Sequence, residues 1–331
     1  MDFSLNEDQL SLQKSAREFL TKECAIEMVH RSFDGPDGDA PELYAHMADL
    51  GWLGLAVPEE HGGVGFGVVE QAVLFEQLGY FNAPGAFFSN TALVIPALIA
   101  VGATDQIAEV VEGKTRYAYV QDPDFVLDGQ LADKFVVVSD EVRIIDASDA
   151  TVTALESIDG TRRFASVQTR AGAGHIIGSA DGLERVLDIA STLLCAESVG
   201  GMQRVLEQTV EYAKVRTQFD RPIGSFQAVK HQLADALLRV ESSRSAALYA
   251  AWANSVGAPD AKFASSVAKA YIAEAAVWVT GAGVQLHGGI GFTWEHDSHL
   301  YFKRAVTNAA LLGDAAHHRA RALSLSPFLG E

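Results

Sequence analysis

The spacing of apolar residues changes twice along the chain. In the first part they recur with the period of a helix, which predicts helices over residues 5–21, 40–50, 68–78, 85–101 and 104–111. From about Thr115 the apolar stretches are short and rich in β-branched residues, which predicts strands over residues 117–120, 135–138, 142–145, 150–155 and 163–168. Beyond Asp181, alanine- and leucine-rich runs predict long helices over residues 183–215, 226–255, 260–281 and 298–325.

These three patterns predict a mainly α-helical fold with a small β domain. We expect an N-terminal helical domain over residues 1–114, a reduced β domain over residues 115–180 and a C-terminal four-helix bundle over residues 181–331. Ser4 or Asn6 is the expected cap of the first helix. The glycine-rich residues 51–67 lack the preceding strand of a dinucleotide fingerprint, and we interpret them as a structured loop between helices.

Charge and composition exclude several kinds of partner. The formal net charge of -18 argues against a surface for nucleic acids or anionic membranes. The longest apolar run, residues 92–102, is shorter than the roughly 20 residues that cross a bilayer, so we expect no membrane insertion. Residues 1–8 lack the basic start of a signal peptide. Cys24 and Cys195 have no disulfide or metal-ligand spacing, which favours a cytoplasmic location.

Two polar motifs fall where the long helical patterns break. Residues 216–227 read Arg-Thr-Gln-Phe-Asp-Arg-Pro-Ile-Gly-Ser-Phe-Gln, and residues 285–292 read Gln-Leu-His-Gly-Gly-Ile-Gly-Phe. A guanidinium offers a planar fork of donors that matches phosphate oxygens. Glycines at helix ends let the backbone approach an anion closely. The motifs therefore predict a site for a large anionic cofactor.

Together with the segment Leu53-Gly-Leu-Ala-Val-Pro-Glu-Glu-His-Gly-Gly-Val-Gly and the three-part domain order, these motifs resemble the acyl-CoA dehydrogenase family of flavoenzymes. The resemblance covers essentially the whole chain apart from the middle domain. It implies an acyl-CoA substrate, FAD bound at a subunit interface, and an electron-transfer flavoprotein as electron acceptor. It also implies which residues contact FAD, namely Arg216, Gln218, Phe219, Gln227, Gln285, Gly288 and Gly289.

The sequence departs from the family at the catalytic base. Family members use a glutamate to remove the α-proton of the thioester while the β-hydride moves to the flavin. Counting from the two motifs, the usual position of this glutamate is Leu312, and the position used by a smaller set of members is Ala190. Both residues are apolar. Asp314 is the remaining candidate base, and we expect Glu197 to be structural.

The middle domain departs as well. In the family it carries an Ala-x-Thr-Glu-Pro-type strand end and a Trp-x-Thr-Asn-type turn that cover the flavin ring, and residues 115–179 contain neither segment and no tryptophan. The resemblance therefore implies the shortened subunit of a heterotetrameric enzyme, whose homologous partner holds most of the FAD and carries the catalytic glutamate. Such relatives act in bacterial steroid degradation, which implies a steroid-derived or branched acyl-CoA.

Other interpretations stay open. The chain could form a self-sufficient homo-oligomeric dehydrogenase that uses Asp314 or another carboxylate, or it could be a flavin-free scaffold subunit. The sequence does not separate dehydrogenase from oxidase chemistry. Glu295, His296, Asp297 and His299 have side chains that could bind a metal, but they open a helix, and we expect acidic capping there and no metal site.

Overall fold

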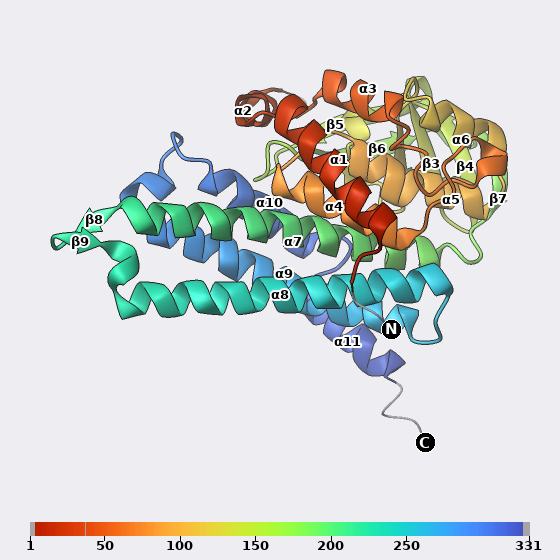
Figure 1. Cartoon of the computed structure of the whole chain (residues 1–331). Helices are drawn as coiled ribbons and strands as arrows, with labels where there is room; N and C mark the ends of the chain where they lie inside the picture. Colours follow the sequence, from red (N-terminus) through yellow and green to blue (C-terminus); the bar gives the residue numbers. More distant parts are fainter. Residues whose placement is uncertain (1–3, 37, 327–331) are drawn as a thin grey trace. The chain divides into compact units, whose positions relative to one another are not determined.

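The computed structural model describes residues 4–36 and 38–326 (Figure 1). Residues 1–3, which contribute to the expectation of no signal peptide, lie outside the described part. The chain forms two compact units, and each is described here by itself. The first comprises Met1–Lys22, Ala72–Asn82 and Ser191–Glu331, and the second comprises Glu23–Gln71 and Ala83–Ala190. The domain boundaries at residues 114 and 180 stay a prediction.

The helices of the second unit are short. They are α2 (Ile26–Asp34), α3 (Pro41–Asp49), the π-helical turn η2 (Ser89–Val94), α5 (Ile95–Ala100) and α6 (Thr104–Val111). The apolar pattern did not predict α2. The predicted helix over residues 85–101 contains a π-helical turn, where the Asn90 amide donates to the Ala86 carbonyl and accepts from the Tyr117 backbone N–H at 3.0 Å. This buried side chain ties the helix to the first strand.

The predicted β region forms two sheets. One is four-stranded in the order β1 (Tyr117–Val120), β3 (Lys134–Val138), β4 (Glu141–Asp146) and β7 (His175–Ser179). The other is three-stranded in the order β2 (Val126–Leu127), β6 (Phe164–Thr169) and β5 (Ala150–Leu155). The pair β1–β3 is parallel and the remaining pairs of these sheets are antiparallel. Val126, Phe135, Ile145 and Val167 belong to the buried core of the region.

The glycine-rich loop of the second unit folds back on itself. The backbone of Phe66 donates to the Leu55 carbonyl at 2.9 Å. A Cβ atom on Gly63 would lie 2.1 Å from the Val57 carbonyl oxygen, so only glycine permits this approach. Gly63 therefore allows two parts of the loop to pack closely, as expected for a structured loop.

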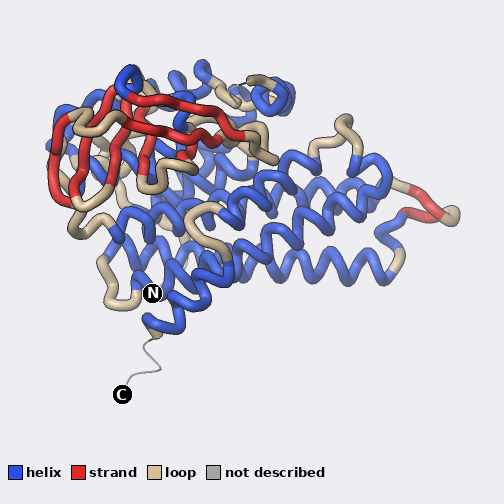
Figure 2. Tube along the Cα trace, turned by 180° about the vertical axis from the view of Figure 1, so that it is seen from behind, coloured by secondary structure: helices blue, strands red, loops and turns tan. Residues whose placement is uncertain are grey.

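The first unit is a helical bundle. It contains α8 (Gln227–Val256), α9 (Ala261–His287), α10 (Ser298–Ala310) and α11 (Ala315–Leu325). It also contains all but the last residue of α1 (Glu7–Glu23), residues 72–80 of α4 (Val68–Tyr80) and residues 191–215 of α7 (Glu184–Val215). Its core includes Val199, Met202, Val240 and Ile272, all nearly inaccessible to solvent. The long helices α7, α8 and α9 lie side by side in Figures 1 and 2.

One bundle prediction was wrong. A single helix was expected over residues 298–325, but α10 ends at Ala310 and α11 begins at Ala315. Leu312 and Gly313 between them have φ angles of 62° and 96°, which no α-helix accommodates. The residues on both sides are rich in alanine and leucine, so the apolar pattern continues across the turn and does not predict it.

Helix α1 begins at a reciprocal cap. The Gln9 backbone N–H donates to Asn6 Oδ1 at 2.8 Å, and the Asn6 N–H donates to Gln9 Oε1 at 3.0 Å. Of the two predicted caps, Asn6 is the one that the structure uses.

Candidate functional site

The first motif joins α7 to α8 through a small hairpin. Arg216 follows the last residue of α7, and β8 (Thr217–Gln218) pairs with β9 (Arg221–Pro222). The two turn residues, Phe219 and Asp220, have φ angles of 53° and 62°, as a type I′ turn requires. Aspartate tolerates this left-handed conformation better than most residues, which explains its place at the second turn position. Figures 1 and 2 show the hairpin at one end of the bundle.

The predicted cofactor contacts of this hairpin are exposed. Arg216, Gln218 and Gln227 are open to solvent, and Phe219 is 86% exposed. Among residues 4–36 and 38–326, no carboxylate pairs with the Arg216 guanidinium. The neighbouring Arg221 guanidinium lies 4.1 Å from the ring centre of Phe226 instead. The hairpin thus offers an exposed guanidinium without a carboxylate partner in the described part of the chain, while the Gln218 amide donates to the Thr217 carbonyl at 2.9 Å.

The second motif closes α9. Gln285 lies in the last turn of α9 and is exposed, and the short helix η6 (Gly288–Phe292) follows. A Cβ atom on Gly288 or Gly289 would meet nothing within 4 Å, so their face is open. Gly288 has φ 68° and ψ -144°, a combination that favours glycine strongly. The motif presents bare backbone at the end of a long helix.

The structure brings the two motifs to the same end of the bundle. The Tyr212 hydroxyl, in the last turn of α7, donates to the His287 carbonyl at the end of α9 at 3.3 Å. All seven predicted FAD contacts therefore belong to one end of the first unit. An exposed guanidinium, three amide side chains and an open glycine turn form a donor set that suits the diphosphate of a dinucleotide.

Sequence reasoning missed a stack of rings beneath this turn. The ring centres of Tyr212 and His287 are 4.5 Å apart, and those of His287 and His296 are 4.2 Å apart. His287 sits inside the second motif, between Gln285 and Gly288, which was the only signal in the sequence. Tyr212 lies 75 positions before His287, so this part of the stack is visible only in the structure.

The expected acidic cap of α10 was wrong. Asp297 at the N-cap position has helical backbone angles and makes no side-chain cap hydrogen bond. The ring nitrogen Nδ1 of His296 accepts the Ser298 backbone N–H at 3.1 Å instead. A capping side chain works best from an extended backbone, so the acceptor comes from the preceding residue.

Neither position expected for the catalytic base carries a carboxylate. Ala190 is completely buried in α7, and Leu312 occupies the turn after α10 in a left-handed conformation that costs a leucine about 1 to 2 kcal/mol. Glu197 is buried in α7 and pairs with the buried Arg304 of α10. This ion pair gives Glu197 the structural role that we expected.

Asp314 serves as a helix cap. Its carboxylate accepts the His317 backbone N–H at 2.8 Å at the start of α11. This hydrogen bond lowers the pKa of Asp314. A carboxylate that is stabilised in its charged form is a weaker proton acceptor, so the geometry argues for a structural role.

A buried lysine holds the turn next to Asp314. The Lys269 ammonium donates to the carbonyls of Asn308, Ala309 and Gly313 at 2.9, 3.1 and 3.0 Å. Burial lowers the pKa of Lys269, whereas the carbonyls at the end of α10 favour its charge. Three hydrogen bonds from Lys269 therefore hold the turn that contains Leu312, the residue at the expected position of the base.

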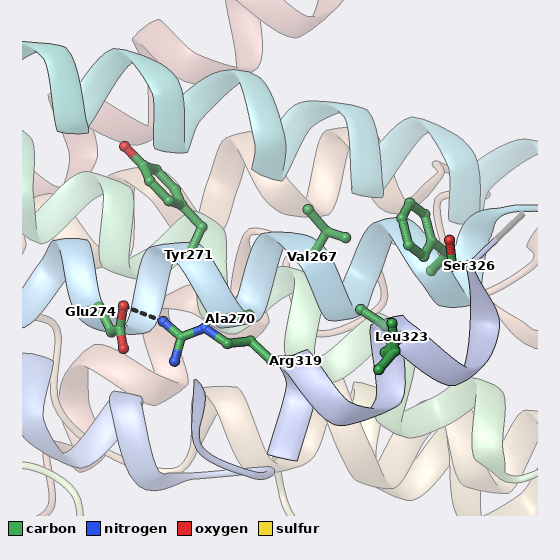
Figure 3. A pocket seen from close by; sticks show the side chains of 9 residues that line it. Val267, Ala270, Tyr271, Glu274, Arg319, Leu323 and Ser326 are labelled. Carbon is green, nitrogen blue, oxygen red and sulfur yellow. Dashed lines mark ion pairs between the residues drawn. The ribbon is translucent and has the colours of Figure 1, made fainter. Parts of the chain in front are cut away.

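A hollow of about 380 Å³ lies elsewhere on the bundle, between α9 and α11 (Figure 3). Its apolar lining includes Val267, Tyr271 and Leu323. The two charged residues in the lining, Glu274 and Arg319, form an ion pair with each other. The hollow therefore offers no unpaired charged group for catalysis.

Comparisons with known proteins identify the family. The profile "Acyl-CoA dehydrogenase, N-terminal domain" matches residues 6–116, and "Acyl-CoA dehydrogenase, C-terminal domain" matches residues 182–323. The acyl-CoA dehydrogenase IpdE2 of Mycolicibacterium smegmatis is 36% identical over 310 residues, which cover 93% of this chain and 96% of the relative. The protein of the same name from Mycobacterium tuberculosis is 33% identical over 308 residues, covering 92% of this chain and 93% of that protein. The chain belongs to the acyl-CoA dehydrogenase family.

Solved structures agree. The ChsE4-ChsE5 complex from Mycobacterium tuberculosis contains a chain that is 28% identical with a TM-score of 0.88, covering 99% of this chain and 100% of that chain. The Tcur3481-Tcur3483 steroid ACAD G363A variant contains one that is 27% identical with a TM-score of 0.87, covering 97% of this chain and 98% of that chain. The three-part order of helical, β and helical regions is therefore confirmed.

The protein is thus an acyl-CoA dehydrogenase, an oxidoreductase whose cofactor is FAD. The exposed donors and the open glycine turn at the end of the bundle fit this cofactor. None of the helices within residues 4–36 and 38–326 is long and apolar enough to cross a membrane.

Proposed function

We propose that the chain is the shortened subunit of a heteromeric acyl-CoA dehydrogenase. It supplies part of the FAD site to a homologous partner, and the partner carries the catalytic carboxylate. One observation carries this proposal: the end of the bundle presents an Arg216 without a carboxylate partner in the described part of the chain and an open Gly288–Gly289 turn, while Leu312 and Ala190 fill the expected positions of the base. A chain with an intact cofactor-binding end and no base suits an enzyme that divides these roles between two subunits.

Each group at this end has a defined task in the proposal. The Arg216 guanidinium binds phosphate oxygens, and the amides of Gln218, Gln227 and Gln285 add neutral hydrogen bonds. Phe219, with 86% of its surface exposed, gives the hairpin an apolar tip that the partner covers. When bound, FAD accepts the hydride from the β-carbon of the acyl thioester.

Two solved structures support the proposed substrate class and the proposed pairing of different subunits. One similar structure is described as a steroid ACAD, and another is a complex of two different proteins, ChsE4 and ChsE5. We infer a bulky steroid-derived or branched acyl-CoA as substrate and an electron-transfer flavoprotein as electron acceptor. Co-expression of the chain with its homologous partner, compared with the chain alone, tests the proposal through flavin content and turnover.

The competing proposal is a homo-oligomer that uses Asp314 as its base. We expect Asp314→Asn to leave the reduction of bound flavin by acyl-CoA unchanged in the complex, because Asp314 caps α11. Asparagine removes the charge and caps a helix about as well as aspartate, so the fold is preserved. Single-turnover flavin absorbance measures the rate. A loss of about 100-fold or more would identify Asp314 as the base and overturn the division of roles.

A further inference from the structure

Hydrogen bonds in the ring stack fix whether Nδ1 carries a proton in each of two histidines. His287 is buried, and its Nδ1 lies 2.7 Å from the Gly283 carbonyl. A carbonyl only accepts, so this nitrogen carries a proton. Nδ1 of His296 accepts a backbone N–H from Ser298 and lies 2.7 Å from the Ser298 hydroxyl, so it must be unprotonated. The hydrogen bond to Ser298 therefore requires His296 to be neutral.

The surroundings favour the neutral forms of both rings. Burial lowers the pKa of His287 and, together with the nearby His287 ring, lowers the pKa of His296. The titratable groups that face the pair are Tyr212 from α7, each histidine for the other, and Asp297, which opposes the shift at His296. The N-terminus of α10 also disfavours a positive charge at His296.

The stack lies directly under the cofactor contacts. Gln285, Gly288 and Gly289 belong to the segment that His287 and His296 anchor to α7 and α10. If His296 gains a proton on Nδ1, it loses its hydrogen bond with the Ser298 N–H and places a charge 4.2 Å from the centre of the His287 ring. Both changes release the segment that carries the glycine turn.

We propose that neutral His287 and His296 are positioning residues of the FAD site, and that protonation of His296 releases the Gly288–Gly289 turn and the cofactor. This inference rests on the proposed role of the turn in FAD binding. The sign of the effect follows from the pKa of a free histidine, about 6.5. Above this pH the turn is held in place. As the pH falls below about 6.5, His296 in the released turn binds a proton at a higher pH than His296 in the held turn. Protonation therefore shifts the equilibrium toward the released turn.

The first test measures FAD affinity of the full complex between about pH 8 and about pH 5.5. We expect the wild type to lose up to about tenfold in affinity over this range, because the uptake of one proton changes an equilibrium by at most tenfold for each pH unit below the pKa of the open turn. His296→Asn should give a flat profile, because the amide oxygen replaces Nδ1 as acceptor and does not titrate. His296→Phe keeps a ring but has no acceptor, and it should bind FAD weakly at every pH.

The second test uses the lone chain and needs no flavin. Trp294 lies between η6 and α10, two residues before His296, and is 67% exposed, so its fluorescence reports on the segment that His296 anchors, with Trp294→Phe identifying its signal. We expect an acid transition in the wild type that His296→Asn abolishes. The same transition in His296→Asn would overturn the inference. A third outcome is possible: His296→Asn abolishes the fluorescence transition, but the FAD affinity of the wild type does not change with pH. This outcome would instead overturn the proposed function of the turn.

Discussion

Replacing Arg216 with alanine is expected to weaken FAD binding by the complex about 10- to 100-fold, since a hydrogen bond to a charged group contributes about 1.5 to 3 kcal/mol. Arg216 is exposed and has no carboxylate partner within residues 4–36 and 38–326. Its removal therefore leaves no buried group unpaired, and the fold should not change. Fluorescence of released FAD at increasing dilution of the complex measures the affinity.

Two variants serve as controls for Arg216→Ala. Arg216→Lys keeps the charge but lacks the planar fork, so it should retain part of the affinity. Arg170→Ala removes an exposed arginine of the β region that pairs with Asp149 at 3.4 Å, and it should leave flavin content unchanged. Unaltered FAD affinity in Arg216→Ala would contradict the proposal and favour the scaffold interpretation.

Replacing Glu197 with alanine is expected to lower the free energy of unfolding by about 3 to 5 kcal/mol, because it removes the carboxylate that compensates the buried Arg304 charge. The side chains of Glu197 and Arg304 are only 4% and 7% exposed. Nearby, α4 and α7 are in close contact: a Cβ atom on Gly79 would lie 1.8 Å from the Glu197 carbonyl oxygen. The tight packing leaves little room for the site to relax. Urea denaturation of the lone chain measures the loss.

The Glu197→Gln variant separates structure from catalysis. Glutamine keeps an acceptor for Arg304, so it should be less destabilising than alanine and should not change flavin reduction in the complex. A variant that folds normally but reduces flavin about 100-fold more slowly would show that Glu197 is the base, and would contradict its structural assignment.

Apolar spacing predicted most of the fold because long helices and regular strands repeat their burial pattern. The predicted strands over residues 117–120 and 150–155 match β1 and β5. The short elements α2, β2 and β7 were missed, since two to nine residues give too few repeats of any pattern. The break between α10 and α11 was missed because it depends on backbone angles at Leu312 that leucine rarely adopts.

For the candidate site, the sequence predicts the residues of the two motifs but not the contacts beneath them. The two motifs predict Arg216 and the Gly288–Gly289 turn as cofactor contacts because these residue types have a direct chemical match to a diphosphate, and these contacts stay a prediction. The ring stack was not predictable, because Tyr212 and His287 are 75 positions apart and meet only through the packing of α7 on α9. The capping role of His296 depends on the backbone angles of Asp297, which no composition argument supplies.

The most direct test of the divided active site is the ratio of flavin to protein. The chain should be purified alone and together with its homologous partner, and FAD absorbance should be compared with the amount of each subunit. We predict that the lone chain carries no stoichiometric FAD and does not turn over acyl-CoA, whereas the complex carries one FAD for each pair of different subunits. A lone chain with a full complement of FAD and complete dehydrogenase turnover would contradict the account.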